Sequence, residues 1–286
     1  MSGAALVLVV CAAVLHAIWN ALAKRAENQF VFLWSSVSLA ALLLTPIGLL
    51  KLRSESAPAA GLPFVAASIA IHALYFWALG RSYRFGDFSR VYPMARGLGV
   101  ALVPLIALPL FGEQLAVLGW LGVSLVVLGI ASLNVTSTAS SSPAVHTRAG
   151  TAWALVTGLT IAGYSLVDKA GVARLHPMPY IALMGLGLSV ILAPLVLANR
   201  PALVREWRLH WRQILVASAM NLTSYLLVLF AFRLSKVGYV VASRELSILF
   251  SAFIGALWLG EGRLAPRLAG ATVVLAGVVC VALARE

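Results

Sequence analysis

The chain has 286 residues, of which 62% are hydrophobic and 10% are charged, and its formal net charge is +12. Soluble domains are roughly 45–50% apolar and about 25% charged, so this composition excludes a soluble globular protein. It also excludes intrinsic disorder, which requires low hydrophobicity. The basic residues are scattered singly and in pairs between apolar runs. This pattern indicates positions that flank membrane spans and predicts no nucleic-acid partner.

Ten apolar segments are each long enough to cross a bilayer, which takes about 20 residues. In chain order they are residues 3–23, 29–50, 62–80, 88–111, 115–134, 149–172, 178–198, 213–232, 237–259 and 264–284. The first is expected to remain as a helix rather than to be a signal peptide, because Lys24 and Arg25 follow it instead of preceding it. The short connections leave no room for a soluble catalytic domain, so we expect the function to reside within the membrane.

The sequence contains an internal repeat around a Ser/Thr-rich linker at residues 135–148. Gly112-Glu113 follows the fourth segment and recurs 148 residues later as Gly260-Glu261 after the ninth. Residues 122–129, bounded by glycines, recur at the same offset as residues 270–277. Glycines seven residues apart share a helix face and allow close helix contact. For Glu113 and Glu261 we expect a capping or turn role.

Each half, residues 1–134 and 149–286, therefore holds five segments. An odd number forces the second half to enter the membrane from the opposite side. The predicted fold is an all-α integral membrane protein with ten transmembrane helices in two inverted five-helix repeats. Secondary transporters are often built in this way, with the site near the midplane between the repeats.

The two halves, each closing with Gly-Glu and a pair of glycines separated by six residues, resemble the EamA-like family of the drug/metabolite transporter superfamily. The opening motif His16-Ala-Ile-Trp-Asn20, with Lys24 just after it, is also similar to the first helix of such proteins. The resemblance implies ten helices, two EamA-type halves and transport of a small metabolite across the inner (plasma) membrane, often as export. In the second half Ile161 stands where His16 does. The two halves are therefore not expected to contribute equally to the site.

Charged residues occur within only four of the ten segments. A charge within a span costs about 2.5–3.5 kcal/mol on insertion scales, so such residues usually face the bundle interior. Arg96 and Arg244 are equivalent at the 148-residue offset. Together they would suit a carboxylate, phosphate or phosphonate; alternatively, each snorkels or binds backbone carbonyls. Glu245, next to Arg244, is a candidate for proton coupling. Asp168, with Tyr164 one turn before it, is either a proton or amine site or an interfacial pair with Lys169.

Three further pairs of polar side chains share a helix face within apolar segments: His16 with Asn20, His72 with Tyr75, and Asn221 with Tyr225. Each pair is either interhelical glue or part of a pocket, and their location on different helices favours a pocket. Prolines such as Pro93 are expected to kink the fourth segment, and broken helices often line transport sites. The candidate substrate-binding residues are therefore His16, Trp19, Asn20, His72, Tyr75, Tyr92, Arg96, Tyr164, Asn221, Tyr225 and Arg244, with Glu245 and Asp168 as candidates for proton coupling.

The predicted function is secondary transport of a small polar metabolite, either anionic or zwitterionic, by alternating access around a midplane cavity. The alternatives are an integral-membrane enzyme and a lipid-linked sugar flippase. The sequence contains no His-Glu-x-x-His, Gly-x-Gly-Asp or Walker A motif, and no metal-ligand spacing joins His16 to His72. We therefore expect no enzymatic activity and no cofactor. The expected partners are the metabolite, the bilayer and protons, and the oligomeric state stays open.

The distribution of Lys and Arg predicts the orientation of the chain. The termini and even-numbered loops carry six basic residues and the odd-numbered loops carry ten. Positive charge favours the inner side, so the odd loops are expected inside and both termini outside. Four of the ten lie in one connection, residues 199–212.

Overall fold

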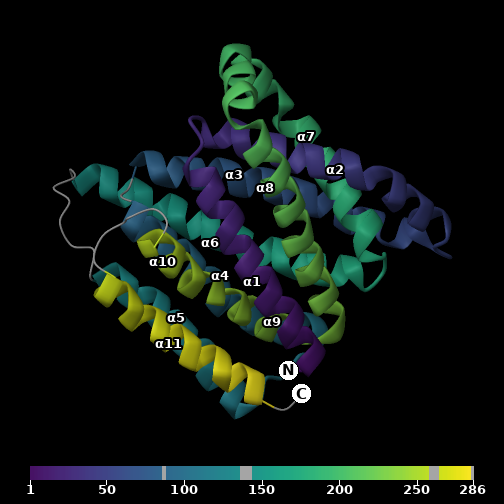
Figure 1. Cartoon of the computed structure of the whole chain (residues 1–286). Coiled ribbons are helices and arrows are strands. Elements are labelled where there is room, and N and C mark those ends of the chain that lie inside the picture. The colour runs from purple at the N-terminus through teal and green to yellow at the C-terminus, as the bar shows by residue number, and fades with distance from the viewer. Residues whose placement is uncertain (86–87, 136–143, 258–263, 285–286) are drawn as a thin grey trace.

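We describe a computed structural model that covers residues 1–85, 88–135, 144–257 and 264–284. Within these ranges every regular element is helical (Figure 1). The elements are α1 (Gly3–Lys24), α2 (Gln29–Arg53), the short 3-10 helix η1 (Pro58–Ala60), α3 (Leu62–Phe85), α4 (Phe88–Phe111), α5 (Val117–Val135), α6 (Ala144–Val172), α7 (Pro177–Leu197), α8 (Arg200–Leu234), α9 (Val237–Arg244), α10 (Leu246–Leu257) and α11 (Leu264–Leu283).

Several helices begin and end at residues whose chemistry explains the boundary. The side chains of Ser2, Asn28 and Asn199 accept hydrogen bonds from backbone N–H groups in the first turns of α1, α2 and α8. These N–H groups have no partner within the helix, so a side-chain acceptor stabilises the end. Gly112 follows the last turn of α4 with φ of 65°, a left-handed conformation that glycine adopts without steric cost.

The helices account for all ten predicted segments, and the chain is a multi-pass membrane protein. Among the described residues, seven helices are long and apolar enough to span a membrane: α1, α2, α3, α4, α6, α7 and α8. The fifth and tenth segments form α5 and α11, whose apolar parts are shorter, Val117–Ser132 and Ala269–Leu283.

The ninth predicted span is not one helix. It consists of α9 and α10, which meet at Glu245. The fourth segment, in which prolines are expected to kink the helix, forms the single helix α4 from Phe88 to Phe111 with Pro93, Pro104 and Pro109 inside it. The helix break therefore lies in the second half of the chain, beside Arg244, the residue equivalent to Arg96 in the repeat.

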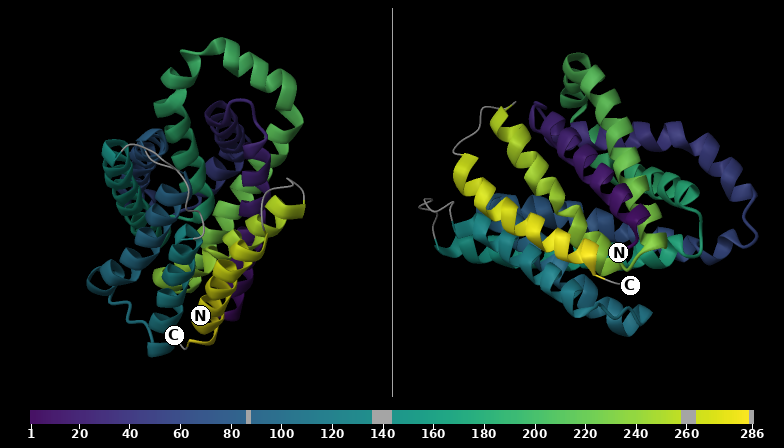
Figure 2. Two further views of the ribbon diagram at one scale, coloured as in Figure 1. Left: turned by 90° about the vertical axis from the view of Figure 1, so that its left-hand side faces the viewer. Right: turned by 60° about the horizontal axis from the view of Figure 1, so that its bottom comes forward.

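The connection at residues 199–212 is also helical, which corrects the expectation of a loop there. α8 begins at Arg200 and has 35 residues, interrupted by non-helical backbone at His210 (φ −126°, ψ 20°). At about 1.5 Å per residue a straight helix of this length would extend roughly 52 Å, well beyond a hydrocarbon core of about 30 Å. The first turns of α8 project at the top of Figure 1 and run across the molecule in Figure 2 before the helix turns inward.

Helices that are distant in sequence pack side by side. α5 lies along α11, α1 crosses α8, and α3 and α4 both pack on α6 (Figures 1 and 2). The contact between α5 and α11 depends on the repeated glycines. A Cβ atom on Gly122 would lie 2.6 Å from the carbonyl oxygen of Gly277, and one on Gly277 would lie 2.6 Å from that of Gly122. The seven-residue spacing therefore correctly predicts a close helix contact.

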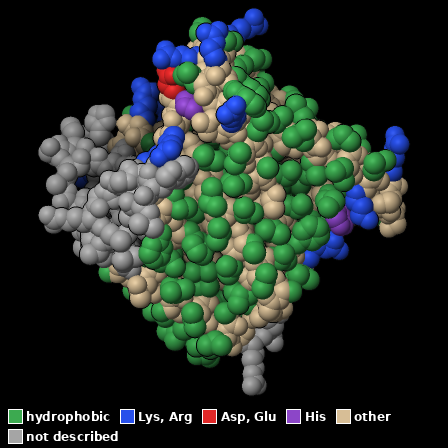
Figure 3. Space-filling model, viewed as in Figure 1, with side chains coloured by type: hydrophobic (Ala, Val, Ile, Leu, Met, Phe, Trp, Pro, Cys, Tyr) green, Lys and Arg blue, Asp and Glu red, His purple; other side chains and the backbone are tan. Residues whose placement is uncertain are grey.

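The surface separates charged edges from an apolar face. Lys and Arg side chains gather at the top, where α8 begins, and at the right-hand end, where α2 ends (Figure 3). Hydrophobic side chains cover the face between these edges, and large apolar residues such as Leu43 and Val190 are mostly exposed. An apolar face of this extent is expected to contact lipid. The two ends of the chain meet, because the amino group of Met1 donates to the backbone oxygen of Ala284 (2.7 Å).

Candidate functional site

Four helices meet at the carboxylate of Asp168, which lies on α6 and is 0% exposed. Its Oδ1 accepts hydrogen bonds from the hydroxyls of Ser68 on α3 (2.6 Å) and Tyr180 on α7 (2.7 Å). Its Oδ2 accepts a hydrogen bond from the hydroxyl of Tyr225 on α8. A buried carboxylate is tolerated only when such donors replace its water shell. We call Asp168, Ser68, Tyr180, Tyr225 and His72 the Asp168 cluster.

His72 completes this cluster from α3. Its Nδ1 lies 2.9 Å from the backbone oxygen of Ser68, and its Nε2 lies 3.5 Å from the hydroxyl of Tyr225. If Nδ1 carries the proton, it donates to the Ser68 carbonyl and leaves Nε2 as an acceptor facing Tyr225. The ring of Tyr164 stacks on the imidazole at a centroid distance of 4.3 Å, and Tyr75 meets Tyr164 edge-on at 5.8 Å. Polar side chains predicted separately on three helices are thus assembled in one place.

Asp168 and Lys169 do not form a pair at an exposed membrane edge, because Asp168 is buried and Lys169 is engaged elsewhere. The Nζ of Lys169 donates to two backbone oxygens at the end of α8 and lies 3.3 Å from Oε1 of Glu113. Oε2 of Glu113 accepts a hydrogen bond from the N–H of Val237 at the start of α9 (2.7 Å). Glu113 therefore has the expected capping role, on a helix of the other half of the chain.

A second buried polar contact joins α4 to the junction of α9 and α10. Arg96 donates from Nε to Oε2 of Glu245 (3.2 Å) and from Nη2 to Oε1 (2.6 Å). The two side chains are 8% and 3% exposed. This bidentate geometry matches a guanidinium to a carboxylate and satisfies both charges away from water. Neither alternative considered for Arg96, a substrate anion or snorkelling and backbone carbonyls, included Glu245, which the structure gives it as a partner.

Arg244 lies between these two groups of residues. Its guanidinium is over the ring of Tyr225, 5.6 Å from the centroid, in a cation–π geometry. Arg244 directly precedes Glu245, the partner of Arg96, so the two arginines belong to neighbouring parts of the interior although their partners differ.

The other predicted site residues are less closely joined to this centre. The side-chain amide of Asn20 donates to the backbone oxygen of His16 (2.7 Å), so it binds its own helix. Trp19 packs in a separate apolar cluster with Phe32 and Ile214, and its ring meets that of His16 edge-on. Asn221 is half-buried one turn before Tyr225. The side chain of Tyr92 lies outside the described part of the chain.

Sequence reasoning missed Ser68 and Tyr180, both of which bind Asp168. Ser68 lies one turn before His72, a spacing that places them on one helix face, but serine is common in apolar helices and gives a weak signal. Tyr180 lies in the first turn of α7, after Pro177 and Pro179, and has the position of an interfacial aromatic residue. Only the packing of α3 and α7 against α6 identifies them.

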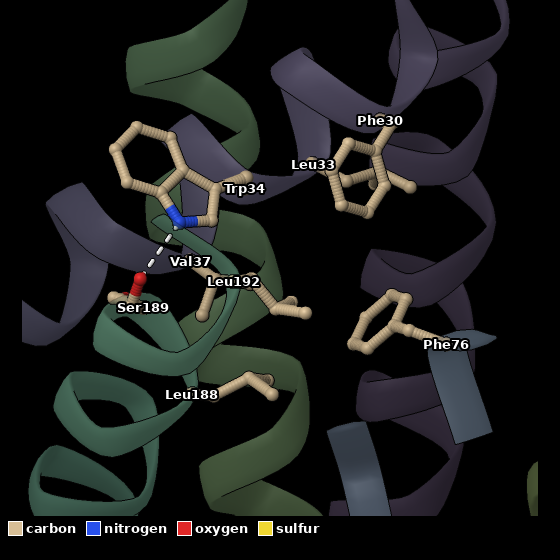
Figure 4. A pocket seen from close by; sticks show the side chains of 8 residues that line it. All are labelled: Phe30, Leu33, Trp34, Val37, Phe76, Leu188, Ser189 and Leu192. Carbon is tan, nitrogen blue, oxygen red and sulfur yellow. Dashed lines mark hydrogen bonds between the residues drawn. The ribbon is translucent and has the colours of Figure 1, made fainter. Parts of the chain in front are cut away.

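An apolar pocket lies apart from the polar residues, between α2, α3 and α7 (Figure 4). Its lining includes Phe30, Phe76 and Leu188, and Trp34 donates from Nε1 to the backbone oxygen of Ser189 beside it (2.9 Å). None of the predicted site residues lines this pocket, and at the Asp168 cluster the polar side chains contact one another directly. Within the described residues no group of three His, Cys, Asp or Glu side chains is placed to hold a metal ion.

The structure is a multi-pass helical bundle with polar and charged side chains joined across its interior, and comparisons with known proteins identify its class. The model of the EamA-like transporter family matches residues 148–283. Over 94 residues the chain is 37% identical to the probable 4-amino-4-deoxy-L-arabinose-phosphoundecaprenol flippase subunit ArnF of Pseudomonas fluorescens, covering 32% of this chain and 68% of that protein. A solved crystal structure shares the fold, with a TM-score of 0.73 over 100% of both chains at 15% identity.

The chain belongs to the EamA-like transporter family and is a membrane transporter of the drug/metabolite transporter type. The resemblance predicted from the repeated Gly-Glu and glycine pairs is therefore confirmed.

Proposed function

We propose that this protein is a secondary transporter that moves a small polar metabolite, anionic or zwitterionic, across the inner (plasma) membrane. The observation that carries the proposal is the position of Tyr225. Its hydroxyl binds the buried carboxylate of Asp168 while its ring faces the guanidinium of Arg244. One acidic and one basic group thus lie on either side of one aromatic side chain, inside the bundle.

Arg244 is better suited than Arg96 to hold the anionic group of a substrate. Two N–H groups of Arg96 are already directed to Glu245. Among the described contacts, Arg244 has an aromatic ring rather than a carboxylate as its partner. Guanidinium groups bind carboxylates and phosphates through two parallel hydrogen bonds, which are stronger than a cation–π contact with one ring. A substrate carboxylate or phosphate would therefore be a stronger partner for the N–H groups of Arg244 than the ring of Tyr225.

Asp168 is the group proposed to bind a substrate amine or to carry a coupling proton. It is surrounded by hydroxyl groups, which can rotate to donate to a carboxylate or to accept from a protonated carboxyl or an ammonium. Glu245 is less suited to this role because it is held by the guanidinium of Arg96. We therefore place coupling at Asp168 and a structural role at Glu245.

Alternating access would come from rocking of residues 1–134 against residues 149–286, related as inverted repeats. The packing supports this relationship because the most extensive contacts between the halves have counterparts when the halves are exchanged. The contact of α3 with α6 corresponds to that of α8 with α1, and α4 on α6 corresponds to α9 and α10 on α1. Exchanging the halves converts the contact of α5 with α11 into itself, and the same holds for the contact of α2 with α7. Inverted repeats commonly place a substrate site at their shared interface.

The test is a flux assay with purified protein in liposomes. Candidate zwitterionic and anionic metabolites are offered with and without a pH gradient, and the lumen is sampled for both the substrate and its chemical products. We expect saturable accumulation of at least one metabolite, reduced in the Arg244→Ala variant and retained in an exposed control variant, Arg53→Gln. Chemical turnover without accumulation would instead identify an integral-membrane enzyme.

A second candidate is the transfer of a lipid-linked sugar between leaflets, for which the similarity to the flippase subunit is the supporting observation. Such a substrate also carries an anionic phosphate for Arg244, together with a long lipid that must remain in the bilayer. Liposomes containing a labelled polyprenyl-phosphate sugar and a membrane-impermeant reagent for the headgroup distinguish the two. Headgroup translocation without soluble metabolite flux would favour the flippase.

A further inference from the structure

The first part of α8, residues 200–212, is a helical segment that the proposed transport site does not use. We call it the α8 arm. It carries four arginines, Arg200, Arg205, Arg208 and Arg212, and all four are exposed. Large apolar side chains lie among them, since Val204, Leu209 and Trp211 are each about half exposed. A helix that exposes basic and apolar side chains together is typical of the membrane–water interface.

The inward side of the α8 arm is anchored to the corner between α1 and α2. Glu206 is 1% exposed, and its Oε2 accepts a hydrogen bond from the N–H of Asn28 (2.8 Å). The indole of Trp207 donates to the hydroxyl of Ser35 (2.9 Å). Nδ1 of His210, at the kink, lies 2.7 Å from Oε1 of Glu206. These contacts fix the angle at which the arm leaves the membrane-spanning part of α8.

The same contacts direct the arginines outward. Arg208 follows Glu206 by two positions, about 200° around the helix, so the two side chains point to opposite sides. Arg212 lies just beyond the kink at His210 and is also exposed, with its guanidinium 5.2 Å from the centroid of the Trp211 ring. Lys24 and Arg25 of the α1–α2 corner are also exposed and lie at the same end of the molecule. The top of the space-filling view shows this concentration of basic side chains (Figure 3).

We propose that the α8 arm lies in the plane of the membrane surface and binds the phosphate groups of anionic phospholipids through Arg200, Arg208 and Arg212. The positive charge of the arm is complementary to an anionic leaflet, and its exposed apolar side chains fit the boundary between headgroups and acyl chains. We expect this surface on the inner side of the membrane, as the distribution of basic residues, including those of the arm itself, predicts. The proposal is independent of the transported substrate.

The experiment measures the thermal unfolding of the purified full-length protein in detergent micelles to which lipid is added. Phosphatidylglycerol is compared with phosphatidylcholine of the same chain length. We expect phosphatidylglycerol to raise the unfolding temperature more, with the difference falling as salt is added, because salt screens exposed charges beyond about 10 Å at roughly 0.1 M.

The variant Arg200→Gln/Arg208→Gln/Arg212→Gln removes the proposed ligands and leaves Arg205 paired with Glu27 (2.9 Å). The matched control is Lys51→Gln/Arg53→Gln/Arg233→Gln, which removes three exposed charges from the other end of α2 and α8. For the same rise in unfolding temperature, we expect the arm variant to need more phosphatidylglycerol than the wild type, by a factor of about five for each arginine removed. The control variant should need the same amount as the wild type.

Three results would overturn the proposal. The first is an equal rise in unfolding temperature with both lipids. The second is an equal loss of the phosphatidylglycerol effect in the arm variant and in the control. The third is reproduction of the full shift by glycerol phosphate or inorganic phosphate without lipid, which would identify a site for a soluble anion. Flux of the metabolite in liposomes is measured in parallel. If phosphatidylglycerol raises the unfolding temperature but the protein shows no flux, the lipid-binding role of the α8 arm stands and only the transport proposal fails.

Discussion

Arg96 on α4 and Glu245 at the α9–α10 junction form a bidentate ion pair, with Nη2 and Oε1 separated by 2.6 Å. The two residues come from opposite halves of the chain, and Glu245 directly follows Arg244, the counterpart of Arg96 in the repeat. The ion pair therefore joins the two halves at the break between α9 and α10 in the second half.

We expect Arg96→Met to destabilise the protein by about 3–5 kcal/mol, because it leaves the buried carboxylate of Glu245 without a cation. The double variant Arg96→Met/Glu245→Met should recover most of this loss, since it removes both charges. Denaturant unfolding in detergent micelles measures both. Equal destabilisation of the single and double variants would show that the unpaired carboxylate of Glu245 is not the source of the loss.

Arg244→Ala should raise the substrate concentration for half-maximal flux by about 10- to 100-fold, since a hydrogen bond to a charged group contributes about 1.5–3 kcal/mol. Unfolding temperature should change little, because the described partner of Arg244 is the ring of Tyr225. Arg244→Lys should recover part of the affinity, as it restores charge without the two-pronged geometry. If the substrate concentration for half-maximal flux is unchanged in Arg244→Ala, Arg244 does not bind the substrate.

Asp168→Asn should abolish the response of flux to a pH gradient, while exchange of substrate across the membrane continues. The amide keeps the size of the carboxyl, its oxygen can still accept from Ser68 and Tyr180, and its NH2 can donate to the hydroxyl oxygen of Tyr225, but it cannot take up a proton. Glu245→Gln is the matched control and should keep the pH response. Loss of the response in the control alone would move the coupling to Glu245.

Gly122→Ala and Gly277→Ala should each destabilise the protein by about 1–3 kcal/mol, as is usual for overpacked contacts. The added Cβ would approach a backbone oxygen of the opposite helix to 2.6 Å in each case. Gly80→Ala is the control, because a Cβ there meets no atom within 4 Å and alanine favours the helix. Destabilisation of all three variants to the same extent would point to backbone conformation rather than to the contact between α5 and α11.

His176, which precedes α7, should make stability depend on pH. Its Nδ1 accepts a hydrogen bond from the N–H of Met178 (3.2 Å), which requires the unprotonated nitrogen. Partial burial, together with the positive charges of Lys51 and Arg233, lowers the pKa of His176 below its usual value of 6.5. Because the folded state disfavours the proton, the stabilising contribution is full above about pH 6.5 and is lost as the pH falls through the lowered pKa.

The measurement is the unfolding temperature between about pH 7.5 and pH 5.5. His176→Asn keeps an acceptor at the helix cap and does not titrate, so its unfolding temperature should fall less than that of the wild type. An equal fall in both would assign the acid sensitivity to other groups.

Much of this protein was predictable because a membrane constrains a sequence strongly. Apolar length identified the spanning segments, and a charge within a span marks an interior position because burial in lipid is costly. For this reason Asp168, Arg96, Arg244 and Glu245 were recognised as candidates. The repeat also predicted a close helix contact, since glycines at a seven-residue spacing lie on one helix face, and the structure identifies the contacting helices as α5 and α11.

The tertiary structure decided which partner each side chain has. Nothing along the chain shows that Glu245 binds Arg96, or that Ser68 and Tyr180 reach Asp168, because these contacts depend on how helices cross. The start of α8 was expected to be a loop because its arginines end the apolar run, yet they lie on a helix that Glu206 anchors to the α1–α2 corner. Hydropathy determines which segments enter the membrane, whereas the rotation and crossing of each helix arise from packing against its neighbours, and these determine the site.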